Sequence, residues 1–381
     1  MADSFSTALA PSALSRLSGW LAHLGVSPLA FDDTLSLISP LLTVHRLHAR
    51  VVAKHRETPG ANTLVLQAGP GFKGLQPGQF ILFGVTIGGV RHRRAYSPRI
   101  VDNRQDRFAI TVQRQPDGLV SRHLNEHTHI GDILEIDQAS GAFTLPTAKP
   151  PEVLLVAGGS GITPCMAMLE HLFQSAPHTK TTLIYFARSR QNRIFAAALD
   201  DLARGWPQLR YMAIDSGVHT VNTAAKPGDT HQAVLNVSLL NQAAPDWLHT
   251  PTFCCGPAPL MDAARQLWCD AGISPQLHLE AFAPPKPSGD SHAMHTVQIE
   301  RSQQRQRFDA PGDQTLLVAG EAAGLTLKHG CRQGICHECT CRLLSGSVRD
   351  LNSGIRIDGE GQPIRLCVSS PMSDLALESL N

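Results

Sequence analysis

The sequence lacks any apolar run long enough to cross a bilayer, and its first thirty residues lack the basic start and continuous apolar core of a secretory signal. It also lacks an excess of either charge, since 33 Lys and Arg stand against 32 Asp and Glu. A formal net charge of +1 offers no broad basic field for nucleic acid and no polybasic stretch for an anionic membrane surface. We therefore expect a cytoplasmic protein that neither spans a membrane nor binds nucleic acid.

Nine cysteines stand out in this otherwise ordinary composition. Thiols stay free in a reducing compartment, so we expect these cysteines to be ligands, active-site thiols or core residues rather than disulfides. The 381 residues, 42% of them apolar, suffice for about two or three domains that each have a core.

Changes in periodicity divide the chain into segments. Leucines at helical spacing between Leu14 and Leu24 open it, short β-rich runs separated by turns follow, and strands such as "VLLVA" and "TTLIYFA" then lead into helical stretches. These patterns predict a helical lid packed on the next domain, with a membrane or partner helix as the alternative, then a barrel or sandwich, then a parallel sheet of βαβ units. The predicted segments are a helical N-terminal extension (1–43), an antiparallel β-barrel (44–150), an α/β domain with a parallel sheet (151–283), a Pro- and Gly-containing linker (284–292) and a small cysteine-rich domain (293–381).

The densest motif is "CRQGICHEC", which sets Cys331, Cys336 and Cys339 at C-x4-C-x2-C spacing, with Cys367 further on in "IRLCVSSP". This is the spacing of the four thiolate ligands of a plant-type [2Fe-2S] cluster. Gly330 and Gly334 give the loop the backbone freedom to wrap closely and turn its N–H groups toward the cluster sulfides.

Two alternatives stay open at this motif. A structural zinc site usually has two short cysteine knuckles, and only Cys336 and Cys339 form one here. Cys341 is a fifth thiol that could replace a ligand, although we expect it to be a small buried strand residue.

Residues 295–381, with "LLVAGEAAGLTLKHGCRQGICHECTCRLLSG" and "LCVSSP", resemble a plant-type [2Fe-2S] ferredoxin domain. The resemblance implies an α+β, β-grasp fold with the four cysteines as metal ligands. His337 departs from the family, which commonly has Gly there. It is either a tolerated loop residue or one that tunes the potential or touches the electron acceptor.

The stretches "RAYSP" and "ITVQRQPDGLVS" resemble the R-x-Y-S strand and the G-x-x-S turn of the flavin-binding domain in the ferredoxin reductase family. By this resemblance Arg94 would neutralise flavin phosphate, Tyr96 would pack on the ribityl chain and ring, and Ser97 would hydrogen-bond near the reactive N5. Backbone N–H groups of the turn would cradle the phosphates. An unliganded barrel with an exposed Arg and a core Tyr is the alternative. The implied flavin contacts are Arg94, Ala95, Tyr96, Ser97, Val112, Arg114, Gly118, Leu119, Val120 and Ser121.

The stretch "GGSGITP" follows the strand "EVLLVA", where a diphosphate can approach the backbone at a helix N-terminus. It resembles the Gly-rich loop of the same reductase family, while "CCGPAP" and "EAF" resemble that family's C-G-P and closing motifs. Besides Ser97, the implied catalytic residues are Cys255 by the nicotinamide, Glu280 near the hydride path and Phe282 over the isoalloxazine. The alternatives are that Glu280 is a surface residue and Phe282 a core residue. The implied nucleotide contacts are Gly159, Ser160, Gly161, Ile162, Thr163, Arg188, Ser189, Arg190, Gly256 and Pro257.

The second strand of the α/β domain ends in "YFARSRQNRIF", which contains no acid. An NAD-specific site would place an Asp or Glu there to accept from the ribose 2′-hydroxyl. We therefore predict NADPH in preference to NADH, with Arg188 and Arg190 on the 2′-phosphate and Arg193 as a solvated helix charge.

The domain order, reductase first and ferredoxin last, predicts an NAD(P)H:acceptor oxidoreductase. A hydride carries two electrons and a [2Fe-2S] cluster takes one, and flavin bridges this mismatch. The resemblance implies FAD, with FMN as the alternative. The extension and "GVRHRRAYSP" look most like reductases of bacterial fatty-acyl desaturase systems, so the expected partner is an electron-acceptor protein, a di-iron desaturase. One alternative is that the partner is a soluble di-iron or Rieske oxygenase and that this reductase uses FMN and NADH. The other alternative is that this protein is a non-catalytic redox carrier.

Overall fold

The computed structural model of the chain describes residues 20, 27–102, 104, 106–216, 234–282, 293–301, 304–359 and 361–380. Two compact units make up the chain, Met1–Glu280 and Ala281–Asn381. The predicted linker and the leucine stripe between Leu14 and Leu24 lie outside the described residues. In the part of the chain that the structure describes, no helix is long and apolar enough to cross a membrane.

Helix α2 (Pro28–Ser36) lies in the segment predicted as a helical extension. It begins at a proline, whose missing N–H costs nothing in the first turn. The buried carboxylate of Asp32 accepts hydrogen bonds of 2.8 Å from the backbone N–H groups of Val44, His45 and Arg46. These bonds fasten the helix to the segment that leads into the first barrel strand.

The first domain is a curled antiparallel sheet of seven strands in the order β4-β3-β7-β1-β2-β6-β5. Strands β4 and β5 lie at opposite ends of this order, yet Ser97 alone separates them in the chain, so the sheet closes into a barrel. Helix α3 (Leu119–Glu126) follows β6. Apolar residues at alternate positions, such as Leu64, Phe83 and Ile110, fill the interior. The strands are β1 (Leu47–Thr58), β2 (Ala61–Ala68), β3 (Ile81–Ile87), β4 (Val90–Tyr96), β5 (Pro98–Ile100), β6 (Arg107–Gln113) and β7 (Ile133–Ile136).

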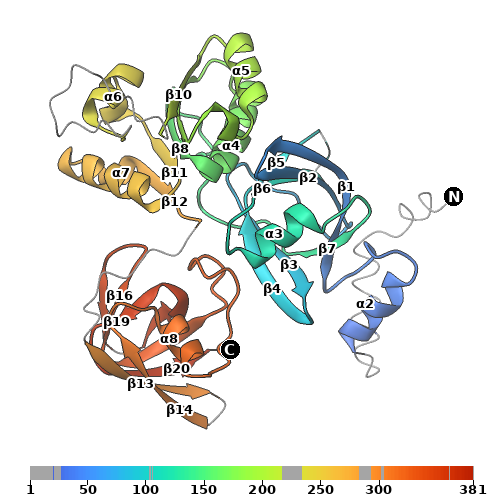
Figure 1. The fold of residues 1–381 in the computed structure, drawn as a ribbon, viewed down its shortest axis with the longest axis vertical. Helices are drawn as coiled ribbons and strands as arrows, with labels where there is room; N and C mark the ends of the chain where they lie inside the picture. Colours follow the sequence, from blue (N-terminus) through green and yellow to red (C-terminus); the bar gives the residue numbers. More distant parts are fainter. Residues whose placement is uncertain are drawn as a thin grey trace. The chain divides into compact units, whose positions relative to one another are not determined.

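The second domain is a five-stranded parallel sheet in the order β10-β9-β8-β11-β12, with helices on both faces (Figure 1). The chain runs from β8 outward to β10 and then crosses back to β11, so the order reverses between β8 and β11. Ligands of open parallel sheets bind at the carboxyl ends of the strands beside such a reversal. The strands are β8 (Glu152–Gly158), β9 (Lys180–Ala187), β10 (Leu209–Asp215), β11 (Thr252–Cys255) and β12 (Leu277–Glu280). The helices are α4 (Ile162–Ser175), α5 (Ala196–Gly205), α6 (Val237–Ala243) and α7 (Ala258–Asp270), with short 3-10 turns η1 (Gly159–Gly161), η2 (Arg190–Asn192), η3 (Trp247–His249) and η4 (Ser274–Gln276).

The second unit has a five-stranded sheet in the order β14-β13-β20-β15-β18, in which β13 and β20 are parallel and the other neighbours antiparallel. A three-stranded sheet in the order β17-β16-β19 and helix α8 (Leu316–Ala322) complete it. The strands are β13 (Met294–Arg301), β14 (Gln304–Pro311), β15 (Thr340–Ser345), β16 (Ser347–Asp350), β17 (Arg356–Asp358), β18 (Gln362–Arg365), β19 (Ser369–Pro371) and β20 (Leu375–Ser379), with η5 (Leu366–Val368) between β18 and β19. The predicted fold class, a β-barrel domain, a parallel-sheet α/β domain and an α+β ferredoxin-type domain, is confirmed.

Candidate functional site

The predicted flavin strand β4 brings a cation, an aromatic ring and a hydroxyl to one end of the barrel. Arg94 and Phe83 are opposite each other on β4 and β3, and the ring of Tyr96 meets the Phe83 ring edge-on at 5.8 Å between centroids. Burial raises the pKa of Tyr96 and the charge of Arg94 opposes the rise, so these two side chains are neighbours. Ala95 lies between them on β4, opposite Leu82.

Helix α3 begins at the predicted phosphate turn. The hydroxyl of Ser121 accepts from Gln115 N at 3.1 Å and donates to Gly118 O at 3.0 Å, so it closes the turn. A Cβ on Gly118 would lie 2.4 Å from that hydroxyl, which explains the glycine. Because the first N–H groups of a helix have no carbonyl within it to bond, Leu119, Val120 and Ser121 present their backbone N–H groups.

The far end of α3 is fixed to the barrel. Lys54 Nζ donates to the carbonyls of Asn125 at 2.7 Å and Thr128 at 2.8 Å, which suits the negative end of the helix dipole. Asn125 Nδ2 donates to Val112 O at 3.0 Å. Val112 is fully buried in the barrel core, so its side chain packs there and its carbonyl holds α3. Arg114 is exposed and lies 3.2 Å from Glu126.

The two predicted nucleotide motifs meet where the strand order of the parallel sheet reverses. Gly159–Gly161 follows β8, and Gly256 follows β11, the strand paired directly with β8. A Cβ on Gly161 would lie 2.1 Å from Cys255 O, and one on Gly158 would lie 2.7 Å from Pro257 Cδ. The glycines therefore allow two backbones to touch. The loop also opens α4, where Ile162 and Thr163 are the first residues and the Thr163 hydroxyl donates to Ser160 O at 3.0 Å.

Ser97 and Glu280 are neighbouring buried polar side chains next to this loop. Glu280 ends β12 beside Cys255 on β11. Within the described residues, neither Ser97 Oγ nor Glu280 Oε2 has a hydrogen-bond partner of normal geometry, although both atoms are buried. Burial raises the pKa of Glu280 to about 8, and the nearby Ser97 hydroxyl opposes that rise. At neutral pH Glu280 is thus a neutral acid that can donate a hydrogen bond.

The other two predicted catalytic residues are placed differently. Cys255 is fully buried, and burial followed by the neighbouring Glu280 raises the pKa of its thiol, so it is a thiol and not a thiolate. Phe282 belongs to the second unit, where its carbonyl accepts a hydrogen bond from Gln333 Nε2. Its position over a flavin stays a prediction.

The loop after β9 presents the predicted phosphate-binding arginines. Arg188 is exposed, the Ser189 hydroxyl donates to Asn192 Oδ1, and Arg190 makes a surface ion pair of 3.2 Å with Asp200. The expectation for Arg193 is wrong. Its side chain is only 13% exposed and lies 2.6 Å from Asp215 at the end of β10. This pair could not be predicted from a sequence motif, because Arg193 lies in the loop after β9 and Asp215 ends β10, 22 residues later.

Arg99 links the barrel to the α/β domain, and the sequence motifs did not reveal this role. Its Nη1 lies 2.9 Å from Glu170 Oε1 on α4, and its guanidinium carbon lies 5.3 Å from the Phe195 ring centroid. Phe195 has φ +61°, a strained conformation for an aromatic residue. Burial raises the pKa of Glu170, and the charge of Arg99 opposes the rise. The contact joins the strand after Ser97 to the helix that starts at the glycine loop.

The four predicted cluster cysteines lie in the second unit as two pairs of neighbouring thiols. The Cys336 thiol donates to Cys331, which also accepts from the N–H groups of Gln333 at 3.3 Å and Cys336 at 3.4 Å, and these bonds hold the pKa of Cys331 below its usual range. The Cys367 thiol likewise lowers the pKa of Cys339. Two thiols for each of two irons is the ligand arrangement of a [2Fe-2S] cluster.

Arg365 on β18 and Asn352 in the turn after β16 donate hydrogen bonds to carbonyls of the cluster loop. Arg365 Nη1 donates to Gly334 O, and its Nη2 lies 2.9 Å from the buried carboxylate of Asp350. Asn352 Nδ2 donates to Gln333 O at 3.2 Å. Because these carbonyls are satisfied from outside, the N–H groups of the loop are free to point toward the sulfurs.

Two loop residues besides glycine are in the left-handed region. Arg332 has φ +61° and forms a two-pronged ion pair with Glu321 on α8. His337 has φ +59° and is exposed. The left-handed backbone would suit a glycine, because only glycine adopts it without steric cost, and it accounts for the departure noted at His337 being a strained one.

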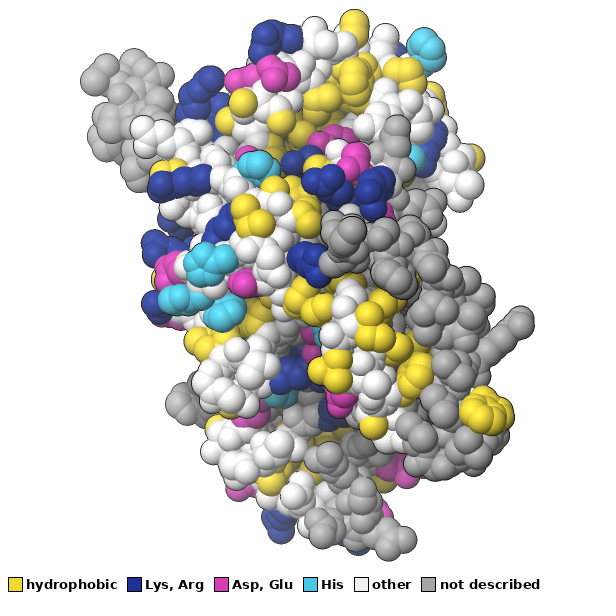
Figure 2. All heavy atoms as spheres, turned by 90° about the vertical axis from the view of Figure 1, so that its right-hand side faces the viewer, with side chains coloured by type: hydrophobic (Ala, Val, Ile, Leu, Met, Phe, Trp, Pro, Cys, Tyr) yellow, Lys and Arg dark blue, Asp and Glu magenta, His cyan; other side chains and the backbone are white. Residues whose placement is uncertain are grey.

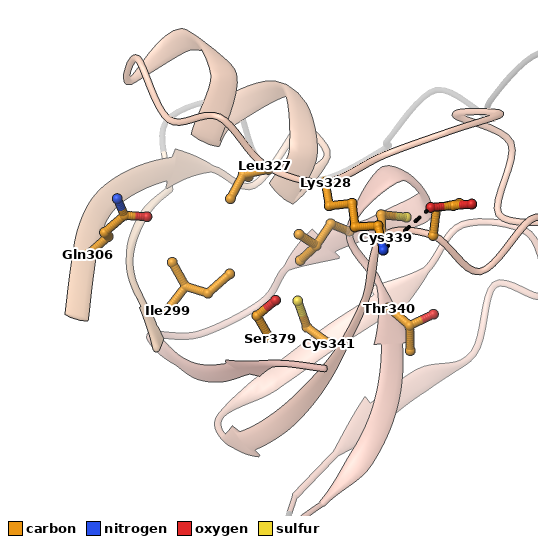
Figure 3. Close-up of a pocket in the computed structure, with 10 residues that line it drawn as sticks. Ile299, Gln306, Leu327, Lys328, Cys339, Thr340, Cys341 and Ser379 are labelled. Atoms are coloured by element: carbon orange, nitrogen blue, oxygen red, sulfur yellow. Dashed lines mark ion pairs between the residues drawn. The ribbon is translucent and has the colours of Figure 1, made fainter. Parts of the chain in front are cut away.

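Cys341 is a neighbour of one cluster cysteine, Cys339, with which it lines a small cavity. It lies on β15, is buried, and burial raises the pKa of its thiol to about 12. Figure 3 shows it beside Ser379 in a small cavity of about 10 Å³, with Ile299 and Leu327 on the other side. It is the small buried strand residue that we expected.

Three family models match the chain in order. They are the oxidoreductase FAD-binding domain at residues 49–145, the oxidoreductase NAD-binding domain at 155–266, and the 2Fe-2S iron-sulfur cluster binding domain at 299–372. The FAD, NAD(P)H and [2Fe-2S] predictions are confirmed.

Similar proteins share the whole arrangement. The chain is 34% identical to an NADPH oxidoreductase of Mycobacterium tuberculosis over 95% of this chain and 93% of that protein. It is 28% identical to a glycine betaine monooxygenase reductase subunit of Chromohalobacter salexigens over 87% of this chain and 95% of that protein. The solved structure of phthalate dioxygenase reductase shares the fold, with a TM-score of 0.57 and 24% identity over 88% of this chain and 98% of that one.

The fold and these matches define an NAD(P)H-dependent electron-transfer oxidoreductase with flavin and iron-sulfur centres. The chain belongs to the ferredoxin reductase-like flavoproteins that carry a C-terminal plant-type [2Fe-2S] domain. The unpaired Ser97 and Glu280 atoms, the touching glycine loops and the N–H groups on the sulfurs fit these cofactors. When bound, flavin takes up a hydride and passes its electrons on singly to the cluster.

Proposed function

We propose that this reductase takes electrons from NADPH and delivers them to a di-iron partner, a membrane-bound fatty-acyl desaturase. The NADPH assignment rests on one observation, the two arginines Arg188 and Arg190 after β9. An NADH-specific site would have an Asp or Glu there to accept a hydrogen bond from the ribose 2′-hydroxyl. The M. tuberculosis relative is named an NADPH oxidoreductase, which supports it. Its match over 95% of this chain must include part of the 43-residue extension, the segment that suggested the desaturase group.

The charges after β9 favour a bound 2′-phosphate. The side chain of Arg190 is 74% exposed in its pair with Asp200, and such surface pairs are worth about 0–1 kcal/mol. A doubly charged phosphate can outcompete that carboxylate for the guanidinium. Asp215, the acid nearest to this strand end, is occupied by Arg193.

Steady-state kinetics test the nucleotide assignment. We expect kcat/KM for NADPH to exceed that for NADH at least about tenfold, the effect of about 1.4 kcal/mol of phosphate contact. Arg188→Ala should lower the value for NADPH and leave that for NADH nearly unchanged. Arg204→Ala is the matched control, because Arg204 pairs with Asp201 on the surface of α5. Comparable values for the two nucleotides in the parent enzyme would contradict the assignment.

The acceptor must bind by short-range contacts. The ferredoxin domain from Ala293 has nine Lys or Arg and ten Asp or Glu, so it lacks the strong acidic field that steers free ferredoxins to basic partners. Its upstream electron donor is in the same chain, so the domain needs no such field to reach that donor. On the cluster loop, Arg332 is paired with Glu321 and Glu338 lies 3.8 Å from Lys328. Exposed His337 and half-buried Ile335 are left as the contact residues.

Reconstitution tests the acceptor. Purified reductase, NADPH and desaturase-containing membranes should give oxygen-dependent double bonds, and Ile335→Ala and His337→Ala should slow turnover about tenfold, as loss of an interface contact of 1–2 kcal/mol would. Met294→Ala, an exposed apolar residue on β13, is the control. Rapid cytochrome c reduction without any desaturation in the same mixture would refute the desaturase assignment.

An oxygenase is the second candidate for the acceptor. Two relatives are named reductase components of monooxygenases, one for glycine betaine and one for 3-ketosteroids. A Rieske or soluble di-iron oxygenase tested in the same assay, with hydroxylated product as readout, distinguishes the two proposals.

A further inference from the structure

Helix α3 and the turn after it carry a group of metal-ligand side chains that the flavin, nicotinamide and cluster sites do not use. The stretch "HLNEHTHIGD" places His123, His127, His129 and Asp132 within ten residues. Figure 2 shows histidine side chains gathered on one face of the molecule. Neutral imidazole is the commonest metal ligand in proteins, so these histidines are candidate metal ligands.

The geometry singles out two of these residues. His123 lies on α3 and His127 is the capping residue directly after it, four positions later and with near-helical backbone, so the two side chains lie on the same side of the helix end. Their ring centroids are 5.7 Å apart, with an angle of 42° between the ring planes. Two histidines at this helical spacing can bind one ion between them, as in helices that carry zinc-binding H-x3-H pairs.

We propose that His123 and His127 form a binding site for a divalent transition-metal ion of the Ni²⁺ or Zn²⁺ type, with water completing the coordination. Within the described residues, no three His, Cys, Asp or Glu side chains come close enough to share one ion. The site is therefore an open two-imidazole chelate rather than a closed structural site with four protein ligands. Imidazole ligands select such ions over Mg²⁺ and Ca²⁺, which prefer oxygen.

The other two residues of the group are engaged with each other. His129 N donates to Asp132 Oδ2 at 2.8 Å, and the His129 ring lies 4.0 Å from the same oxygen. His129 is therefore a matched control. It is an exposed histidine two residues from His127 that the proposed site does not use.

The position of the site gives it a consequence for the enzyme. An ion bound by both His123 and His127 would link the second turn of α3 to the residue that caps the helix. The proposed phosphate cradle at Gly118 lies at the other end of the same helix. Ligands that bind only the folded state stabilise it. Saturating metal should therefore raise the melting temperature of the holoenzyme. This thermal effect does not depend on the nucleotide or acceptor assignments.

The experiment is a calorimetric titration of the tag-free holoenzyme, loaded with FAD and cluster, with NiCl₂. We expect one saturable site that MgCl₂ does not fill. His127→Gln should weaken Ni²⁺ binding about a hundredfold, since a second tethered ligand gains at least that factor. His129→Gln should bind Ni²⁺ as the parent does. Melting curves without metal check that both variants fold.

Two results would overturn the site. One is unchanged Ni²⁺ affinity in the folded His127→Gln variant, which would place the ion elsewhere among the 18 histidines. The other is an equal loss in His129→Gln, which would mean a different ligand set. Zn²⁺ in place of Ni²⁺ should give the same ranking of the variants.

Discussion

Replacing Cys331, Cys336, Cys339 or Cys367 by serine is expected to abolish the visible iron-sulfur absorption and to lower cytochrome c reduction at least about a hundredfold. Loss of a residue that only supports a metal ligand already costs up to about a hundredfold, and these cysteines are the ligands themselves. The reason lies in the pairing of the thiols. Cys331 with Cys336, and Cys339 with Cys367, are neighbours close enough to hydrogen-bond. Removing one thiol leaves one iron without its second protein ligand.

Two controls separate cluster loss from general damage. Ferricyanide reduction by NADPH should persist in these variants, because the first unit holds the flavin and nucleotide domains and has its own core. Cys341→Ser should keep the cluster spectrum, since that thiol belongs to neither of the two thiol pairs, although it lines a small cavity together with Cys339. Loss of the spectrum in Cys341→Ser together with its retention in Cys367→Ser would reverse the ligand assignment.

The sequence predicted those parts of the site whose chemistry requires a fixed local spacing. Four cysteines must reach one small cluster, and glycines must stand where two backbones touch, so the motifs around Cys331 and Gly161 were readable without coordinates. The alternation of strands and helices was equally clear. The order of the parallel strands then placed the glycine loop and Cys255 side by side, as ligand binding at a strand-order reversal requires.

Contacts between residues far apart in the chain could not be predicted in this way. The Arg99–Glu170 pair joins a barrel strand to a helix 71 residues later, and the Arg193–Asp215 pair joins the loop after β9 to the end of β10. Neither pair has a local spacing rule. The sequence showed a histidine in place of glycine at His337, but not that its backbone is left-handed. Asp32 looked like any surface acid, because its three N–H partners begin twelve residues later.

Tuning of reactivity also comes from burial, which a sequence does not display. The motif placed Glu280 near the hydride path but did not show that burial raises its pKa to about 8. The same burial leaves the Ser97 hydroxyl without a partner of normal geometry among the described residues. A buried hydrogen-bond donor without a partner lowers the stability of the folded state, so folding by itself gives no reason to keep this arrangement. It is explained if both groups are kept for a ligand that binds between the two domains of the first unit.

Ser97→Ala is therefore expected to slow reduction of the bound flavin by NADPH about a hundredfold, the usual effect of removing one preorganised hydrogen-bond donor from a reacting centre. Ser97 stands between β4 and β5, where the barrel closes, and its hydroxyl is the group that opposes the raised pKa of Glu280. Without it the pKa of Glu280 should rise further. Stopped-flow bleaching of the flavin absorption in a single turnover measures the rate.

The controls for Ser97→Ala locate the defect. Ser97→Thr keeps a hydroxyl and should recover most of the rate, whereas a purely structural role at this 5% exposed position would make the larger side chain at least as harmful as alanine. Flavin content should stay unchanged, and chemically pre-reduced Ser97→Ala enzyme should pass electrons to cytochrome c at the parent rate, because the cysteines of the second unit are untouched. Flavin reduction at the parent rate in a flavin-loaded Ser97→Ala variant would remove Ser97 from the hydride-transfer step and leave Cys255 and Glu280 as the remaining candidates beside the nicotinamide.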